Sequence, residues 1–412
     1  MTVESWVTES VANCLVPVSV AGKTKIQSRD YKPSGRFPVI DQGQEQIAGW
    51  TDDESAVIEM PLPLVVFGDH TRAFKFLDAP FARGADGTQL LRPKPGIDPL
   101  FFFYACRAID LPARGYNRHF TILKEKALSY PTGDDEQKTI AAVLRQTEWA
   151  LTQQSALLET LQETKRAAMA RLFTHGLRGE AQKETEIGLV PESWSVERLD
   201  NRAQVVSTRM PYTELESAVD EQVNAVRVVG IKVSDMNRAG NETVIAEAAL
   251  EKHLDAKVAT YRCAPPGTIV FPKRGAAIAT NKKRLTESWS VFDPNVIGVV
   301  PGSTINARFL FHWFQSFDLR TITEPGPTPQ LNKKHLDPLP IPVPPTTDEQ
   351  EEIVAILDAL DRKIALHRQK RAVLEELFQS LLHKLMTGEI AVSDLDLSAL
   401  SPASTKHAEV TA

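Results

Sequence analysis

The stretch DEQEEIVAILDALDRKIALHRQKRAVLEELFQSLLHKLMT, residues Asp348–Thr387, decides how this chain is organised. Its apolar residues recur at alternating steps of four and three, which is the spacing of one long amphipathic helix. An earlier stretch, Asp135–Thr174, begins with the same Asp-Glu-Gln tripeptide and aligns with it without a gap, at an offset of 213 residues. The sequence therefore predicts two copies of one long helix, which divide the rest of the chain.

Both helices carry the heptad seam that buries an apolar stripe against a partner helix. The two copies are therefore expected to pack on each other within one chain. The alternative is two unrelated surface helices, but the register and the endings of the copies agree. Gln154 and His367 share one repeat position of the seam, where a polar residue lowers stability but can fix the register. The predicted helix-pairing residues are Ile140, Leu144, Leu151, Leu158, Leu161, Leu172, Ile353, Leu357, Leu360, Ile364, Leu374, Phe378, Leu381 and Leu385.

Length and composition limit the classes of protein that remain. A chain of 412 residues is too long for a single core, so two or more domains are expected. No run of eighteen apolar residues and no apolar N-terminal segment occurs, so neither a membrane span nor a secretory signal is predicted. Three scattered cysteines without metal-ligand spacing fit a reducing cytoplasm. A net charge of −6 argues against a protein that binds nucleic acid over its whole surface.

The segments around the two helices contain short apolar runs broken by glycine and proline, which is typical of short strands. The predicted fold class is α+β, with two mixed domains separated by the two long helices. The proline-rich tract at 338–345 is expected to be extended and to lead into the second helix. The predicted divisions are a first domain at 1–133, the first helix at 134–175, a linker at 176–192, a second domain at 193–345, the second helix at 346–388 and a disordered tail at 389–412.

Positive charge is concentrated in one part of the second domain. From Lys257 to Arg284 there are seven lysines and arginines and no acidic residue. Such a cluster in an acidic protein predicts contact with DNA phosphates, and Arg and Asn side chains can also read base edges. The alternative is a solvated loop that happens to carry several lysines. The predicted DNA-binding residues here are Lys273, Arg274, Gly275, Asn281, Lys282, Lys283 and Arg284.

Candidates in the first domain rest on a weaker signal. Asp69, His70, Thr71 and Arg72 follow an expected strand, at a position where functional loops often lie. A second basic loop contains Arg114 and Arg118 on either side of an aromatic residue. An ordinary turn explains either stretch equally well. Both are retained as predicted DNA-binding sites.

Several phrases in the sequence resemble one family, the specificity subunits of type I restriction-modification systems, a bacterial defence. They are the two helices that begin Asp-Glu-Gln, TEIGLVPESW at Thr185–Trp194, QLNKKHLDPLPIPVPPTTDEQ at Gln330–Gln350 and FPKRGAAIATNKKR at Phe271–Arg284. The resemblance covers nearly the whole chain. The helices and the linker phrases match more closely than the two domains, which vary within this family.

The resemblance implies both an architecture and a set of partners. Each domain would be a target recognition domain that reads one half of a bipartite, asymmetric site in double-stranded DNA. The helices would form an antiparallel coiled coil that relates the domains by a pseudo-two-fold axis and sets the spacing of the half-sites. Two modification (methyltransferase) subunits and the restriction subunits would dock on this chain. S-adenosylmethionine, ATP and Mg would bind to those partners, and this chain would hold no cofactor, no metal and no catalytic centre.

The residues themselves agree with a non-catalytic role. The sequence contains no Asn/Asp-Pro-Pro-aromatic tetrapeptide of an amino-methyltransferase. Ala21–Thr24 imitates the end of a phosphate-binding loop, but Pro17 stands where that loop requires glycine. The alternative function is a protein-interaction scaffold that oligomerises through its coiled coil. The cationic stretch favours DNA recognition over that scaffold.

Overall fold

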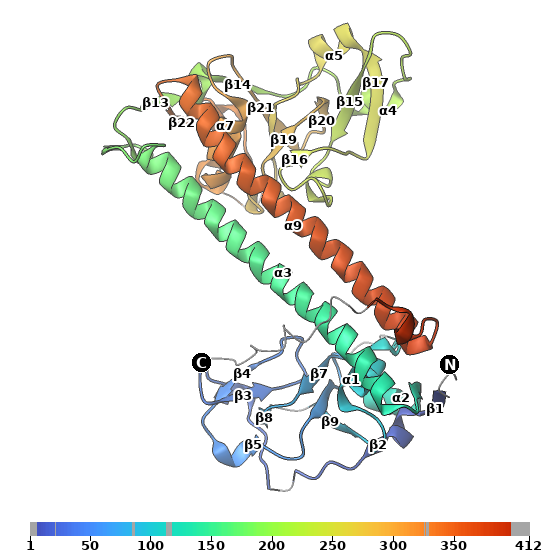
Figure 1. Cartoon of the computed structure of the whole chain (residues 1–412). Coiled ribbons are helices and arrows are strands. Elements are labelled where there is room, and N and C mark those ends of the chain that lie inside the picture. Colours follow the sequence, from blue (N-terminus) through green and yellow to red (C-terminus); the bar gives the residue numbers. More distant parts are fainter. Residues whose placement is uncertain are drawn as a thin grey trace. The chain divides into compact units, whose positions relative to one another are not determined.

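The computed structural model describes residues 6–20, 22–84, 87–112, 118–324, 326 and 329–396. It divides the chain into two compact units, one formed by Met1–Ser155 with Lys370–Ala412 and the other by Ala156–Gln369. The two long helices, α3 (Asp134–His175) and α9 (Thr347–Thr387), each contribute one half to each unit (Figure 1). Helices and short strands alternate in both units, which confirms the predicted α+β fold class.

The long helices pair in an antiparallel direction, as is evident within each unit separately. In the first unit, Ile140 and Leu144 near the start of α3 share a core with Phe378 and Leu385 near the end of α9. In the second unit, the end of α3 shares a core with the start of α9, since Leu172 packs in the same cluster as Ile353 and Leu357, and Leu158 and Leu161 cluster with Ile364. Most predicted seam residues are buried. Those that are only half-buried are Leu151, Leu360, Leu374 and Leu381.

In its described residues, the first unit contains one strand pair and two four-stranded sheets. The strand pair joins β1 (Trp6–Ser10) to β10 (Ala127–Pro131) in antiparallel register. One sheet has the order β2-β9-β6-β7, with β2 at Leu15–Val16, β9 at Thr88–Pro93, β6 at Leu64–Gly68 and β7 at Phe74–Leu77. The other has the order β4-β3-β8-β5, with β4 at Gly49–Thr51, β3 at Phe37–Ile40, β8 at Phe81–Arg83 and β5 at Val57–Ile58. The helices are α1 (Pro99–Ala108) and α2 (Phe120–Glu125), with short 3-10 turns at Val11–Cys14, Ser28–Asp30, Glu54–Ala56 and Val392–Asp394.

Where the structure describes the second unit, it contains two strand pairs and two larger sheets. The pairs are β11 (Gln182–Thr185) with β12 (Gly188–Pro191), and β13 (Ser195–Arg198) with β22 (Pro340–Val343). The five-stranded sheet runs β14-β21-β18-β19-β16, with β14 at Ala203–Val206, β21 at Val296–Pro301, β18 at Ile269–Pro272, β19 at Arg284–Thr286 and β16 at Val244–Ile245. The three-stranded sheet runs β17-β15-β20, with β17 at Leu250–Asp255, β15 at Ala225–Ile231 and β20 at Trp289–Phe292. The helices are α4 (Tyr212–Ser217), α5 (Ala256–Arg262), α6 (Ala276–Ala279), α7 (Ala307–Ser316) and α8 (Lys333–Leu336), with 3-10 turns at Leu199–Asn201, Asp235–Asn237 and Leu319–Ile322.

Each domain is fastened to the long helices by one of its own helices. In the first unit this is α1, whose phenylalanines share the core that contains Leu144 of α3 and Phe378 of α9. In the second unit it is α7, and Phe309 packs edge-on against Phe173 of α3 at 5.6 Å and against Trp194 at 5.8 Å. α1 and α7 begin in the same way, because the side chains of Asp98 and Asn306 each accept hydrogen bonds from two backbone amides of the first turn.

The glutamine of the repeated Asp-Glu-Gln tripeptide makes the same contact in both units. Gln137 Oε1 accepts a hydrogen bond from the backbone N–H of Asp98 at 2.7 Å, and its amide nitrogen donates to the carbonyl oxygens of Pro131 and Gly96. Gln350 Oε1 accepts from the backbone N–H of Asn306, also at 2.7 Å. Both glutamines are buried. The repeat therefore preserves a hydrogen bond between each long helix and the N-cap of a domain helix.

Two segments differ from what the sequence suggested. Residues 176–192, predicted to be a linker, contain the β11–β12 hairpin. The predicted tail at 389–412 begins with ordered chain, because Val392 is buried in the core of the first unit and Ile390 and Leu395 pack against it. Residues 397–412 lie outside the described part of the chain. The proline tract is extended as predicted, and it pairs as strand β22.

No helix in the described residues is both long and apolar enough to cross a membrane. The long helices are instead amphipathic, with charged residues on the faces that the seam leaves exposed.

Replacing Gln137 by leucine is expected to lower the free energy of unfolding by about 1–3 kcal/mol, since it leaves the partly buried N–H of Asp98 without its hydrogen-bond acceptor. Gln350→Leu should act similarly through Asn306. Urea unfolding of the full chain measures both. Gln153→Leu, at an exposed position of α3, is the control and should change stability by less than about 0.5 kcal/mol. If the two buried variants matched this control, the shared contact would not contribute to stability.

Candidate nucleic-acid interface

The predicted contact residues from Lys273 to Lys283 lie between β18 and β19, two neighbouring strands of the five-stranded sheet. Lys273 directly follows β18, and Arg274 forms an isolated antiparallel bridge with Gln330. Gly275 then adopts a φ of 66°, a left-handed conformation that favours glycine, and its backbone N–H donates to the carbonyl oxygen of Pro329. Arg274 is exposed and Lys273 is half-buried, so both can meet a ligand from solvent.

A pocket of about 440 Å³ brings Lys273 close to two lysines that are distant in sequence. Lys333 and Lys334 at the start of α8 line it, together with Asn332 and Ser207. The ends of β14 and β18 and the start of α8 meet here. Lys333 is paired with Asp337 at 3.0 Å and Lys334 with Glu324 at 2.5 Å, whereas no ion pair is recorded for Lys273 among the described residues. Exposed pairs of this kind are weak and can be exchanged for a phosphate.

Lys333 and Lys334 are not among the DNA-binding residues predicted from the sequence, although they belong to the phrase QLNKKHL that carries part of the family resemblance. The charge count covered a single continuous stretch, and these lysines lie about fifty residues beyond its end. Two adjacent lysines after an asparagine were the available signal. The folded chain brings them to the pocket of Lys273, next to the bridge between Arg274 and Gln330.

Three predicted contact residues of this stretch point inward instead. Lys283 is only 3% exposed, and its ammonium group donates to the carbonyl oxygen of Phe317 at 2.5 Å. Asn281 donates to the same carbonyl and accepts from the backbone N–H of Leu319, so its amide fixes the turn after α7. Arg284 donates to the carbonyl oxygens of Met236 and Lys283. Burial corrects the prediction of Lys283 as a DNA-binding group, whereas Asn281 and Arg284 are half-buried and make these contacts within the domain. Lys282, half-buried, donates to the side-chain oxygen of Asn237.

Burial also changes the acidity of these side chains. Desolvation lowers the pKa of Lys283 to about 8, although the nearby Asp318 opposes this shift. Burial likewise lowers the pKa of Arg284 from its ordinary value. A lysine that is costly to keep charged is poorly suited to bind a phosphate, because phosphate binding requires the positive charge.

The predicted turn of the first domain is mainly a structural one. Asp69 is buried, and its carboxylate accepts a hydrogen bond from the backbone N–H of Phe120 at 2.7 Å. The Thr71 hydroxyl donates to the carbonyl oxygen of Gln42, and the backbone N–H of His70 donates to the Gln42 side chain. Arg72 has a φ of 61° and is exposed, with one guanidinium nitrogen on the carbonyl oxygen of Leu111 at 2.6 Å. Asp69 and Thr71 are therefore corrected to turn-forming residues, and Arg72 keeps a surface position.

The second basic loop is only partly visible. Arg118 is exposed, whereas Arg114 lies outside the described residues. Arg72 lines a larger groove of about 970 Å³ in the first unit, whose wall on α3 includes Arg145 and Trp149. Trp149 is 53% exposed, which is unusual for so large an apolar side chain.

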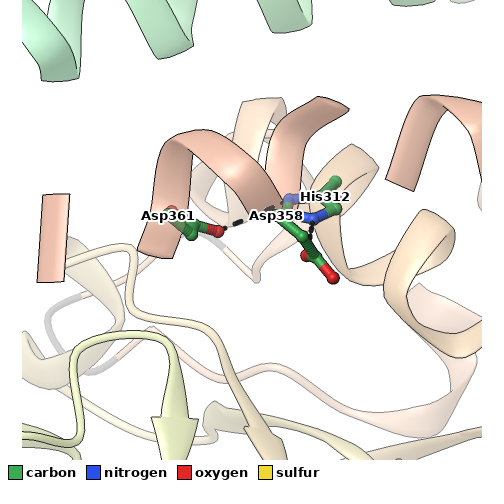
Figure 2. A group of neighbouring side chains, drawn as sticks. All are labelled: His312, Asp358 and Asp361. Atoms are coloured by element: carbon green, nitrogen blue, oxygen red, sulfur yellow. Dashed lines mark hydrogen bonds and ion pairs between the residues drawn. The ribbon is translucent and has the colours of Figure 1, made fainter. Parts of the chain in front are cut away.

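One cluster in the second unit has the composition of a metal site. His312, Asp358 and Asp361 present one ligand atom each within 4.8 Å of one another, and Figure 2 shows both carboxylates of α9 beside the imidazole of α7. Two cations already contact this cluster, because Arg308 lies 2.6 Å from Asp358 and Lys165 lies 2.6 Å from Asp361. The carboxylates are thus balanced within the protein, and the cluster is an ion-pair network.

Hydrogen bonds keep Asp358 charged in this network. Burial alone would raise its pKa, but hydrogen bonds from His312 at 2.8 Å and from Arg308 outweigh burial and hold the pKa of Asp358 below its ordinary value. His312 is fully buried, and its other ring nitrogen faces Asp361 at 4.0 Å.

Lys283→Met should remove a pH dependence of stability. Between pH 8 and 10.5 the unfolded chain binds the Lys283 proton and the folded chain does not, so folding is stabilised as pH rises through this window. Relative to the variant, the wild type should gain up to about 3 kcal/mol across that range. Urea unfolding of both proteins at several pH values measures this gain, with the exposed Lys257→Met as control. If the free energy of unfolding changed with pH in the same way in all three proteins, the lowered pKa of the buried Lys283 would be contradicted.

Comparison with known proteins gives a consistent result. Residues 267–376 match the family model described as type I restriction modification DNA specificity domain. The putative type I restriction enzyme MjaX specificity subunit of Methanocaldococcus jannaschii is 24% identical over 327 residues, which cover 74% of this chain and 71% of that protein. The MjaVIII specificity subunit of the same organism is 24% identical over 276 residues, 64% of this chain and 62% of that protein.

Solved structures agree on the fold. The S subunit of the type I restriction-modification system from M. genitalium superimposes with a TM-score of 0.63 at 14% identity, covering 94% of this chain and 97% of that one. A chain from a study of complex assembly and conformational transition of the type I R-M system gives a TM-score of 0.52 at 15% identity, covering 93% and 98%. With the repeated helices and the two α+β domains, these matches make the chain similar in sequence and in fold to the specificity subunits of type I restriction-modification systems.

Proposed function

We propose that this chain is the specificity subunit of a type I restriction-modification system, in which each domain reads one half of a bipartite, asymmetric DNA site and the paired helices set the distance between the halves. The same helices dock two methyltransferase subunits, and the restriction subunits join this assembly in the cytoplasm. The chain itself contributes recognition without catalysis. S-adenosylmethionine, ATP and Mg are bound by the partner subunits.

The observation that carries this proposal is that one helix repeat holds two different domains in the same way. Gln137 and Gln350 make the same hydrogen bond to the N-caps of α1 and α7, at Asp98 and Asn306. Each correct base pair contributes roughly 1–3 kcal/mol of discrimination, so one domain that reads a few pairs is not selective in a genome. Two domains on a common support make the second contact intramolecular, which raises its effective concentration.

The lysine pocket of the second domain supports contact with phosphates. Lys273, Lys333 and Lys334 converge there, and Arg274 is exposed on the adjoining bridge. These groups would fix the position of the domain on the duplex, whereas base-edge contacts would supply the sequence preference.

Exposed apolar residues on the long helices support docking of partner subunits. In the first unit they are Trp149, Val373 and Leu377, and in the second Leu157, Ile356 and Leu366. Isolated exposed leucines are common, but several on one helix pair provide a surface for apolar helices of another subunit. We assign these positions to the methyltransferase subunits.

Production of this chain together with its methyltransferase subunit, in a host that lacks adenine methylation, should yield methylated adenines only in a bipartite motif. Sequencing of the methylated genome identifies the two half-sites and the length of the spacer. The control is the methyltransferase subunit without this chain, which should leave the genome unmodified. A continuous motif, or methylation that does not depend on this chain, would contradict the proposal. Self-association of this chain without any effect on methylation would instead favour the scaffold.

Lys273→Gln combined with Lys333→Gln should weaken binding to the bipartite duplex and reduce its salt dependence. Loss of two phosphate contacts lowers the slope of log affinity against log salt by about 2. Titration of labelled duplex at several salt concentrations measures this slope. Lys363→Gln, at an exposed position of α9 remote from the pocket, is the matched control. Equal slopes for the double variant and the control would show that DNA does not contact the pocket.

A further inference from the structure

One acidic residue of the long helix recurs at the same repeat position and faces the domain helix in both units. Glu148 of α3 and Asp361 of α9 are 213 residues apart, as are the two helix copies. Glu148 accepts a hydrogen bond from the hydroxyl of Tyr104 at 2.9 Å. Asp361 faces the ring of His312 at 4.0 Å. Tyr104 and His312 occupy equivalent places, because each is the sixth residue after the N-cap of its helix.

The cation that balances this acid comes from a different element in each unit. In the first unit it is Arg107 of α1, whose guanidinium lies 2.5 Å from Glu148. In the second unit the residue equivalent to Arg107 is the uncharged Gln315, and the cation is Lys165 of α3, 2.6 Å from Asp361. Lys165 also approaches the Gln315 side-chain oxygen at 3.5 Å. The acid is therefore paired with a cation in both units, which belongs to the domain helix in the first unit and to the helix seam in the second.

The seam position of Lys165 is filled by an aromatic residue in the first unit. Its counterpart at the 213-residue offset is Phe378 of α9. The ring of Phe378 contacts Tyr104 edge-on at 6.3 Å and lies beneath the guanidinium of Arg107 at 5.3 Å. One unit therefore has an aromatic seam residue with a cationic domain helix, and the other has a cationic seam residue with a neutral domain helix.

The register of the two helices determines whether the buried charge of Lys165 has a partner. The residue is only 7% exposed, and Asp361 is nearly as well shielded. A shift of α3 along α9 would separate the pair and leave two charges buried without a partner, which is strongly unfavourable. Polar seam residues fix helix register in this way. An aromatic seam residue such as Phe378 imposes no comparable electrostatic restriction.

The same network extends into the second domain. Asp358, three residues before Asp361 on α9, accepts a hydrogen bond from His312 at 2.8 Å (Figure 2). Its other carboxylate oxygen contacts Arg308 at 2.6 Å. His312 and Arg308 both belong to α7. Lys165, Asp361, Asp358, His312 and Arg308 therefore connect α3, α9 and α7 through charge pairs, and we call these five residues the polar seat.

We propose that Lys165 and Asp361 are positioning residues, which fix the register of α3 against α9 and the orientation of the second domain on them through the polar seat. This inference rests on the proposed function, because its functional consequence is strict discrimination between half-site spacings. A second domain that tilts on its helices would accept the second half-site at altered distances.

The exchange seen between the two units supplies the test. Lys165→Phe should leave Asp361 without its cation and lower the Tm of the full chain by about 5 °C or more. Lys165→Phe with Gln315→Arg recreates the arrangement of the first unit and should recover most of this loss. Arg166→Met, next to Lys165 but in an exposed pair with Glu163, is the matched control and should leave the Tm unchanged.

Methylation by the complex with the methyltransferase subunit then measures spacing. Targets with the native spacer and with one base pair more or less are compared for each variant. Lys165→Phe should lower the preference for the native spacer by about tenfold, and the double variant should restore it. A single variant with unchanged Tm and preference, or a double variant that recovers neither, would overturn the inference. Failure of the wild-type complex to methylate a bipartite target would instead refute the proposed function, and the Tm series would still decide whether the charge exchange holds.

Discussion

The architecture depends on the burial of one apolar seam by two copies of the same helix. The seam is continuous with the core of each domain. In the first unit Leu144 and Phe378 lie in the cluster that contains the phenylalanines of α1, and in the second Phe173 packs on Phe309 of α7. Each large apolar side chain buried in this way contributes roughly 1.5–3 kcal/mol. Since the domains and the helices share these residues, neither forms a complete core alone.

The polar contacts at the seam have a different role from the apolar ones. Burial of an ion pair such as Lys165 with Asp361 adds little net stability, because desolvation of both charges offsets their attraction. The ion pair instead disfavours other registers of the two helices, since a shifted register leaves both charges unpaired. The hydrogen bonds of Gln137 and Gln350 act in a similar way on the domain helices, because each accepts from one particular backbone N–H. The apolar seam thus supplies affinity between the helices, and these few polar groups supply their alignment.

The helices and the fold class could be predicted from the sequence, whereas much of the candidate interface could not. Heptad spacing is a local property, so Ile353 and Leu357 could be placed on the seam from their intervals alone. A charge count does not show whether a side chain points to solvent or into the protein. It therefore groups Lys283 with its surface neighbours, although the ammonium group of Lys283 caps the end of α7 at Phe317. Lys333 could not be predicted from the charge count because it lies far along the chain from Lys273, and the bridge between Arg274 and Gln330 brings the two segments together only in the folded protein. The Asp-Glu-Gln tripeptide was recognised as a repeat, but the partner of its glutamine is visible only in three dimensions.

The spacing of the equivalent positions shows where the two domains were free to differ. The long helices repeat at 213 residues, whereas the N-caps of α1 and α7, Asp98 and Asn306, are 208 residues apart. The five additional residues of the second copy therefore lie between its domain helix and its long helix. That connection contains α8 with Lys333 and Lys334, the lysines of the candidate phosphate pocket. The contacts that hold a domain on the helices constrain its cap, its sixth helical residue and one acid on the long helix. The segment that connects these fixed points does not take part in the contacts, so it can change in length and charge without a change in how the domain is held.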